Sequence, residues 1–194
     1  MEETLKNLHK AFIGESQARN RYTMAAKQAK KDGYEQISEI FTETAEQERE
    51  HAKQLSKMIN ILLADNSKEQ GPIEVMAEGA AMFSDTIKNL ENAINGEHYE
   101  HTIMYPEFAA KAKEEGLDAI AKRLISIGLA EKHHEARYQK LVDQITAGTL
   151  FEKEEVKAWK CRKCGYVHLG KSPPKECPSC DHGKAYFQIN CEEY

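Results

Sequence analysis

The chain has 194 residues, with 27 Lys+Arg against 32 Asp+Glu, and a formal net charge of −5. This mild acidity argues against a nucleic-acid-binding protein, which normally carries a basic patch. The hydrophobic fraction of 40% allows a buried core. Neither a secretory signal nor a membrane span is predicted, because the N-terminus has no apolar region and no apolar run approaches about 18 residues. We therefore expect a cytoplasmic protein with no membrane or nucleic-acid partner.

Four helices are predicted by apolar residues that recur every three or four positions. Gly33 and Gly116 mark short turns where left-handed caps end helices, which predicts two antiparallel pairs. A polar stretch at 64–72 joins the second and third helices, as in an all-α, ferritin-like four-helix bundle with a long crossover. Pro106 is expected to kink the third helix. The predicted helices span 4–31, 34–63, roughly 78–115 and 117–147.

The two helix pairs resemble each other in sequence. Glu15 recurs as Glu97 at an offset of 82, and KQAKKDG at 27–33 recurs as AKAKEEG at 110–116, an offset of 83. Such an internal repeat predicts two halves related by a pseudo-twofold axis.

Acidic side chains interrupt the apolar stripes of all four helices. Isolated buried carboxylates cost several kcal/mol each and normally become protonated. Lysines are scarce on these stripes, so bound metal cations are the simplest explanation of how the buried carboxylates are compensated. The core-facing polar positions are Glu15, Glu48, His51, Glu97, Glu131 and His134.

The spacing of these residues agrees with a metal site. The segments 47–51 and 130–134 both contain Glu-x-x-His, which places a carboxylate and an imidazole on one side of a helix. Two helices then give single glutamates and two give Glu-x-x-His, the pattern of ferritin-like di-iron carboxylate proteins. These ligands favour iron, manganese or zinc over calcium or magnesium. Glu100 follows Glu97 by one helical turn and also points toward the site, although the spacing alone allows a surface position.

Other polar residues near this level have less specific signals. Tyr22 and Tyr105 are either packing residues or hydrogen-bond donors to the ligands. Surface or core positions are expected for the histidines without partner spacing: His9, His98, His101 and His133.

All five cysteines lie after position 160, and Cys191 is expected to be a free thiol. The other four form a CxxC…CxxC pair typical of a tetrahedral thiolate site for zinc or iron. A segment of about 40 residues is too small to bury a large core, so it needs a metal site or disulfides for stability. A cytosolic location disfavours disulfides. We expect a bundle domain at 1–150 and a small β/loop metal domain at 156–194. The four proposed ligands are Cys161, Cys164, Cys177 and Cys180.

Spacing does not decide between the two metals in this tail. Zinc would make it a structural or interaction module, whereas iron would let it carry one electron. The neighbouring metal bundle favours the electron carrier.

Six segments carry a family resemblance that extends over nearly the whole chain: GESQARNRY (14–22), QEREH (47–51), GEHYEHTIMYPEFA (96–109), AEKHH (130–134), CRKCGYVH (161–168) and CPSC (177–180). Together they resemble the rubrerythrin family, in which a ferritin-like di-iron domain is followed by a rubredoxin-like domain. The resemblance implies one iron held by the four cysteines, and Tyr22 and Tyr105 behind the di-iron ligands. It also implies the following ligand roles: Glu48 and Glu131 bridge both irons, Glu15 binds the first, Glu97 and His134 bind the second, and His51 and Glu100 alternate on the first in the diferrous and diferric states.

The resemblance further implies a homodimeric peroxidase that reduces hydrogen peroxide to water and protects against oxidative stress. Its electrons come from NAD(P)H through a separate reductase or rubredoxin, because no nucleotide-binding glycine fingerprint is present. In the family, the rubredoxin centre of one subunit lies near the di-iron site of the other. The alternatives left open are a ferroxidase or iron-storage protein, a binding protein with a structural zinc tail, and an enzyme whose main substrate is O₂.

Overall fold

The computed structural model describes residues 2–65, 72–77, 79 and 84–192. The helical part comprises α1 (Glu2–Lys31), α2 (Glu35–Asp65), α3 (Thr86–Tyr99), the π-helix η1 (Glu100–Met104), α4 (Tyr105–Glu114) and α5 (Asp118–Thr146). The C-terminal region comprises β1 (Lys157–Cys161), β2 (Val167–Gly170), the 3₁₀-helix η2 (Lys184–Tyr186) and β3 (Phe187–Ile189).

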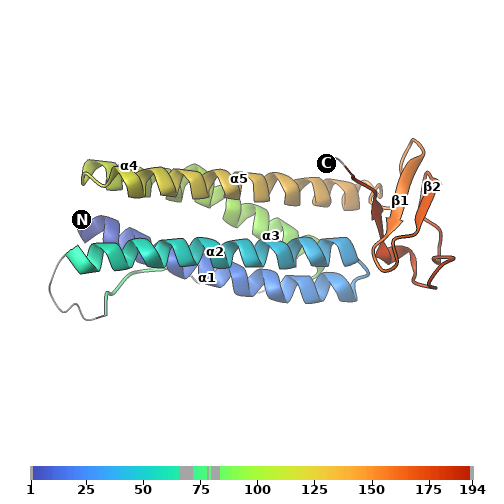
Figure 1. Ribbon diagram of the computed structural model, residues 1–194, viewed down its shortest axis with the longest axis horizontal. Coiled ribbons are helices and arrows are strands. Elements are labelled where there is room, and N and C mark those ends of the chain that lie inside the picture. Colours follow the sequence, from blue (N-terminus) through green and yellow to red (C-terminus); the bar gives the residue numbers. More distant parts are fainter. Residues whose placement is uncertain (1, 66–71, 78, 80–83, 193–194) are drawn as a thin grey trace.

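The helices form a four-helix bundle in which α3, η1 and α4 together make the third helix. The helix α1 packs on α2, and the third helix packs on α5. In Figure 1, α2 ends at the left and α3 begins toward the right, so their connection runs along the bundle. The predicted long crossover is therefore confirmed. The connection is longer than the expected 64–72, because the third helix begins at Thr86 rather than at 78. Residues 66–71, 78 and 80–83 of this connection lie outside the described residues.

The two short turns have the same geometry. Gly33 has φ +84° and Gly116 has φ +78°, a region that costs other L-residues energy. In both turns the next residue donates its backbone N–H to the carbonyl five positions earlier, at 2.8 Å. These bonds complete Schellman-type caps, and the predicted left-handed glycines are confirmed.

Each turn also caps the first helix of the other pair. The Asp32 carboxylate accepts hydrogen bonds from the Thr86 backbone N–H at 3.0 Å and from its hydroxyl at 2.6 Å. The Glu115 carboxylate accepts one from the Thr4 backbone N–H at 3.1 Å. The two acids are related by the repeat offset of 83, and the two threonines by the offset of 82. The contacts are therefore equivalent under the repeat, which gives the pseudo-twofold relation a structural basis.

The second half contains one extra residue, and η1 accommodates it. The offset is 82 between Glu15 and Glu97, but it is 83 between Tyr22 and Tyr105. The insertion falls between Glu97 and Tyr105, where η1 replaces regular α-helix, and single π-turns of this kind interrupt α-helices at functional sites. Pro106 follows in the first turn of α4, where its missing N–H is tolerated. The irregularity in the third helix is thus a π-helix that ends at Met104, two residues before Pro106, and the kink expected at Pro106 stays a prediction.

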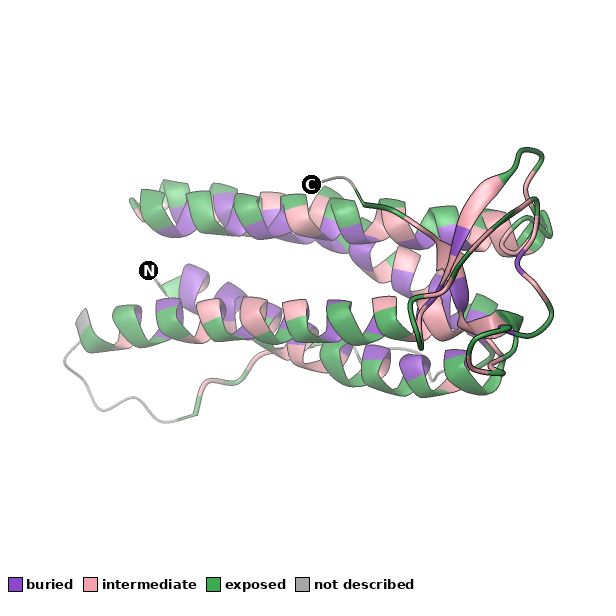
Figure 2. Cartoon of the chain, turned by 45° about the vertical axis from the view of Figure 1, so that its right-hand side comes forward, coloured by how far each residue is buried: buried purple, intermediate pink, exposed green. Residues whose placement is uncertain are grey.

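Two apolar clusters fill the bundle, one toward each end, and buried residues follow the inner helix faces in Figure 2. Neither cluster includes residues from the middle of the bundle. The gap between the clusters lies between Ala11 and Ala18 on α1, between Ala45 and Leu55 on α2, between Ala93 and Met104 on the third helix, and between Ile127 and Tyr138 on α5.

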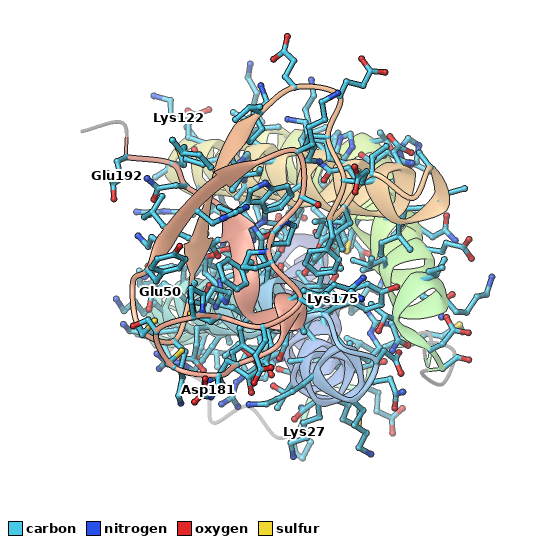
Figure 3. The ribbon with its side chains drawn as sticks, turned by 90° about the vertical axis from the view of Figure 1, so that its right-hand side faces the viewer. Lys27, Glu50, Lys122, Lys175, Asp181 and Glu192 are labelled. Atoms are coloured by element: carbon cyan, nitrogen blue, oxygen red, sulfur yellow. The ribbon has the colours of Figure 1, made fainter. Side chains whose placement is uncertain are left out.

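The C-terminal region is a small antiparallel sheet with strand order β2-β1-β3. Trp159 on the central strand pairs with His168 and Ile189 and packs with Phe187 and two cysteines in a separate small core. Figure 3 looks onto this end of the molecule, with the sheet in front of the bundle helices. None of the described helices has the length and apolar character needed to cross a membrane.

Asp32→Ala should lower the free energy of unfolding by about 1 kcal/mol, because it removes both hydrogen bonds that the carboxylate accepts from Thr86 at the start of α3. Urea unfolding at pH 7 measures the loss. Glu46→Ala, which removes only an exposed ion pair with Arg49, is the control and should change stability by less than about 0.5 kcal/mol. Equal stability of the two variants would contradict the reciprocal capping.

Candidate metal centres

The gap between the apolar clusters holds the seven polar side chains predicted for the di-iron site. All except His51 are classed as buried, and His51 is partly buried. They come from all four long helices: Glu15 from α1, Glu48 and His51 from α2, Glu97 and Glu100 from the third helix, and Glu131 and His134 from α5.

Six of these side chains form two groups of four potential ligands that share two members. In each group, one ligand atom from every residue lies within 4.8 Å of the others. Glu48 and Glu131 belong to both groups and therefore lie between two possible ion positions. The groups are Glu15, Glu48, His51 and Glu131, and Glu48, Glu97, Glu131 and His134.

Each imidazole contacts both shared glutamates. The Nδ1 atom of His51 lies 2.9 Å from Glu131 Oε1 and 3.0 Å from Glu48 Oε2. The Nδ1 atom of His134 lies 2.8 Å from Glu131 Oε2 and 3.3 Å from Glu48 Oε1. The near-equivalence of the two sides follows from the repeat, because both histidines come from Glu-x-x-His segments related by the offset of 83.

The two tyrosines each hold one oxygen of an unshared glutamate. The Tyr22 hydroxyl donates to Glu97 Oε1 at 2.5 Å, and the Tyr105 hydroxyl donates to Glu15 Oε1. The Oε2 atoms of both glutamates have no hydrogen-bond partner. The tyrosines therefore orient these carboxylates and leave one oxygen of each available as a ligand.

The donor set fits two transition-metal ions. Buried polar atoms without hydrogen bonds are rare, because each costs about 1–3 kcal/mol. Six such atoms belong to this cluster, and carboxylate oxygens with imidazole nitrogens are suitable ligands for iron and similar ions. The six are Glu15 Oε2, Glu48 Oε1, Glu97 Oε2, Glu131 Oε1, Glu131 Oε2 and His134 Nδ1.

Without metal, protons supply the positive charge that the cluster requires. Burial raises the pKa of Glu97 to about 8 and that of Glu15 well above its ordinary value. Burial also acts on Glu48, but the neighbouring imidazoles of His134 and His51 outweigh it and lower its pKa to about 2. Burial opposes the charged form of His134, yet the carboxylates around its ring raise its pKa to about 12.

Glu100 is buried but lies outside both groups of four. A Cβ atom placed on Gly14 would lie 3.9 Å from Glu100 Oε1, so the carboxyl group faces α1. Burial, followed by the charge of Glu15, raises the Glu100 pKa well above its ordinary value. Its position in η1 thus places a fifth buried carboxyl group beside the Glu15 half of the cluster, rather than on the surface.

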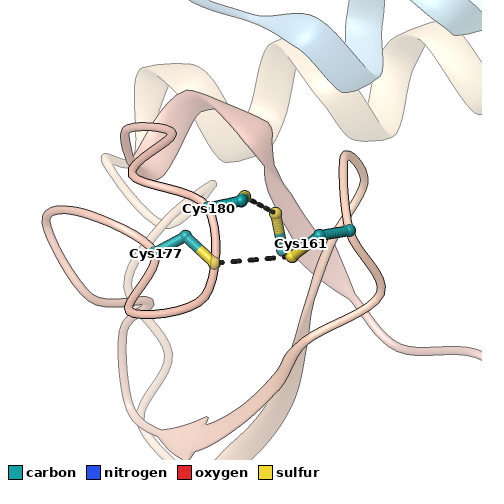
Figure 4. A group of neighbouring side chains, drawn as sticks. Cys161, Cys177 and Cys180 are labelled. Carbon is teal, nitrogen blue, oxygen red and sulfur yellow. Dashed lines mark hydrogen bonds between the residues drawn. The ribbon is translucent and has the colours of Figure 1, made fainter.

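The four cysteines of the CxxC pairs converge in the C-terminal region (Figure 4). The Sγ atoms of Cys161 and Cys180 are 3.8 Å apart, and those of Cys164 and Cys177 are 3.7 Å apart. A disulfide requires about 2.05 Å, whereas a tetrahedral metal site with bonds of about 2.3 Å separates its sulfurs by about 3.8 Å. A backbone hydrogen bond from Tyr166 lowers the Cys164 pKa to about 6, which favours the thiolate that binds metal. Cys191 is a free, exposed cysteine outside this group.

A fourth group of potential ligands was not predicted from the sequence. His98 and His101, expected to have surface or core positions without partners, both contact Glu135. The two histidines stand at positions i and i+3, a spacing that places them on one helix side. This spacing could have indicated a shared site, but the third residue, Glu135, lies on another helix and cannot be found from the spacing.

Two family models match the chain: rubrerythrin over residues 6–142, and the rubredoxin-like domain of rubrerythrin over residues 159–188. This chain belongs to the rubrerythrin family. A protein of Methanocaldococcus jannaschii, whose given name places it among the rubrerythrins, is 55% identical over 195 residues, covering 100% of this chain and 96% of its own length. The two cofactor sites are accordingly the di-iron site of the family in the bundle and a rubredoxin-like four-cysteine site.

Solved structures agree with this assignment. Nigerythrin in its fully reduced, all-ferrous state matches with a TM-score of 0.62 and 33% identity, covering 96% of this chain and 86% of that chain. Bacterioferritin of Mycobacterium tuberculosis matches with a TM-score of 0.65 and 16% identity, covering 76% and 88%. The second match shows a common fold, and the predicted ferritin-like bundle is confirmed.

Metal removal should make stability fall as pH rises from 6 to 9. The pKa of Glu97 is about 8 in the folded protein and 4.5 in the unfolded chain. The pKa of His134 is about 12 in the folded protein and 6.5 in the unfolded chain. At a pH between its two pKa values, each group holds its proton mainly in the folded state, so the free energy of unfolding of the metal-free protein decreases as pH rises. Thermal unfolding at pH 6, 7.5 and 9 measures the trend.

The metal-loaded protein is the control for this experiment. Its stability should vary less over the same range, because metal binding replaces the protons. Metal-free protein that is more stable at pH 9 than at pH 6 would contradict the electrostatic account of the cluster.

Proposed function

We propose that this protein is a peroxidase that reduces hydrogen peroxide to water at its di-iron site and thereby protects against oxidative stress. Electrons reach the site through the rubredoxin-like centre. The observation that carries the proposal is the presence, in one chain of this family, of a two-ion carboxylate cluster and a four-thiolate site. A ferroxidase or storage protein has no need of an electron-carrying tail.

The two groups of four support a specific set of ligand roles. We assign Glu48 and Glu131 to both irons, because they belong to both groups. Glu100 is assigned to the first iron as the alternative to His51, since its buried carboxyl group faces the Glu15 side. The remaining assignments are Glu15 and His51 to the first iron, Glu97 and His134 to the second, and Cys161, Cys164, Cys177 and Cys180 to one iron in the C-terminal region.

Reduction of hydrogen peroxide to two waters needs two electrons and two protons. A bound pair of ferrous ions supplies both electrons, so no one-electron step that releases a radical is required. The surrounding residues hold protons. Burial raises the pKa values of Tyr22 and Tyr105, which stay protonated and keep their glutamates oriented. Glu100 holds a further proton beside the Glu15 half because burial raises its pKa.

Peroxide enters from the His51 side of the cluster. The His51 side chain is 15% exposed, whereas that of His134 is 4% exposed. The first iron position is therefore the one closer to solvent, while the four glutamates of the two groups are buried. Exclusion of water strengthens the electrostatic interactions inside the site.

The position of the cysteine site favours electron transfer between subunits. Arg162, next to Cys161, pairs with Glu39 on α2 at 2.5 Å. Glu39 precedes Glu48 by nine positions, about 14 Å along the helix, and the cysteines lie beyond Glu39. We therefore propose a homodimer in which the C-terminal region of one subunit serves the cluster of the other. A separate reductase or rubredoxin supplies the electrons from NAD(P)H. We also propose domain limits of 1–150 and 156–194.

The central test is a stopped-flow experiment in which fully reduced protein is mixed with an excess of hydrogen peroxide, because each chain holds three electrons and one peroxide accepts two. Rapid return of the ferric-thiolate absorption is expected. Glu131→Gln should slow this return at least about hundredfold, since it removes a ligand common to both irons. Matched rates in the variant and the wild type, or a colourless zinc-containing tail, would contradict the proposal. Faster oxidation by O₂ than by peroxide would assign the reaction to O₂.

Complementation tests the route between subunits. Cys161→Ser should abolish turnover by removing the electron carrier, and Glu131→Gln should abolish it at the cluster. Heterodimers of the two variants, formed by co-expression and purified with two tags, contain one intact carrier facing one intact cluster. About half of the wild-type turnover per dimer is expected if transfer occurs between subunits. No recovery in a confirmed heterodimer would contradict the arrangement.

A further inference from the structure

Three potential metal ligands lie together outside both iron sites. His98 belongs to α3, His101 to η1 and Glu135 to α5. One ligand atom from each lies within 4.8 Å of the other two. The His98 side chain is 60% exposed and that of His101 is 14% exposed, so this group is accessible from solvent, unlike the buried di-iron cluster.

The Glu135 carboxylate contacts both imidazoles. Its Oε1 atom lies 3.0 Å from His98 Nδ1, and its Oε2 atom contacts His101 Nε2. The two imidazole rings are edge to face, with centroids 5.4 Å apart. Each of the three side chains thus directs a nitrogen or oxygen atom into the same small space.

The helix register that builds the inner cluster also builds this outer group. His98 follows Glu97, His101 follows Glu100, and Glu135 follows His134. Successive residues of a helix point about 100° apart. Helices that direct the first residue of each pair into the bundle therefore direct the second residues to a common flank, where α3 and η1 pack against α5.

Two imidazoles and one carboxylate are a ligand set for divalent transition metals such as zinc and ferrous iron. A tetrahedral site with bonds of about 2.1 Å separates its ligand atoms by about 3.4 Å. The present separations need only small side-chain movements to reach that value, and the exposed His98 ring has room to make them. A site with three protein ligands leaves further positions for water.

We propose that His98, His101 and Glu135 form a third metal site, which binds one divalent transition-metal ion and exchanges it with solvent. The competing explanation is an ion pair in which one carboxylate accepts from two imidazoles and no metal binds. The two explanations differ in stoichiometry, because only the first adds an equivalent of metal to protein whose iron sites are full.

The test is a calorimetric titration of iron-loaded protein with Zn²⁺ under anaerobic conditions, followed by metal analysis of protein held at equilibrium with free Zn²⁺ by dialysis. One additional equivalent of zinc per chain is expected, with full retention of iron. His98→Ala and Glu135→Gln should each weaken this binding at least about tenfold. His133→Ala is the matched control, because it removes an exposed imidazole that belongs to none of the four groups of potential ligands.

Three results would overturn the proposal: no additional zinc, equal weakening in His133→Ala, or loss of one iron for each zinc bound. The last would show displacement from the di-iron site. Circular dichroism of each variant confirms that the bundle is intact. The outcome does not depend on peroxidase activity, so this inference and the proposed function fail separately.

Discussion

The structure depends on the burial of charge in the middle of a helical bundle. Five carboxyl groups and two imidazoles occupy the gap between two apolar clusters. An uncompensated carboxylate there would be strongly destabilising. The tyrosines, the shared contacts of the histidines and the bound irons all serve to compensate these charges. The apolar clusters on either side provide the stability that lets the bundle tolerate such a centre.

The internal repeat explains both the symmetry of this centre and its one asymmetry. Equivalent turns cap equivalent helices, and equivalent tyrosines hold equivalent glutamates. The extra residue in η1 breaks the relation. It lies where Glu100 is added on the Glu15 side, whereas the corresponding positions of the first half hold Gln17 or Ala18. The two halves of the cluster are therefore chemically different, because only the Glu15 half has a fifth carboxyl group beside it.

Patterns within single helices predicted most of this protein. Apolar periodicity located four helices, and Glu-x-x-His spacing indicated the residues that meet. Features that depend on which residue caps a helix, or on contacts between helices, were missed. The third helix begins late because the Asp85 carboxylate accepts a hydrogen bond from the Lys88 backbone N–H at 2.9 Å and caps it there. The one sign of the π-helix in the sequence is that the offset between the two halves of the repeat changes from 82 to 83. The contact of His98 with Glu135 joins two helices that are distant in sequence.

Proton release on metal binding tests the central claim most directly. In metal-free protein at pH 7, buried carboxyl groups and imidazoles hold protons that two ferrous ions must displace. Anaerobic pH-stat titration of the metal-free bundle with two equivalents of ferrous iron, with zinc already in the cysteine site, counts them. The account predicts release of more than about two protons per chain. Release of fewer than about one would contradict the exchange of protons for metal at the centre of the bundle.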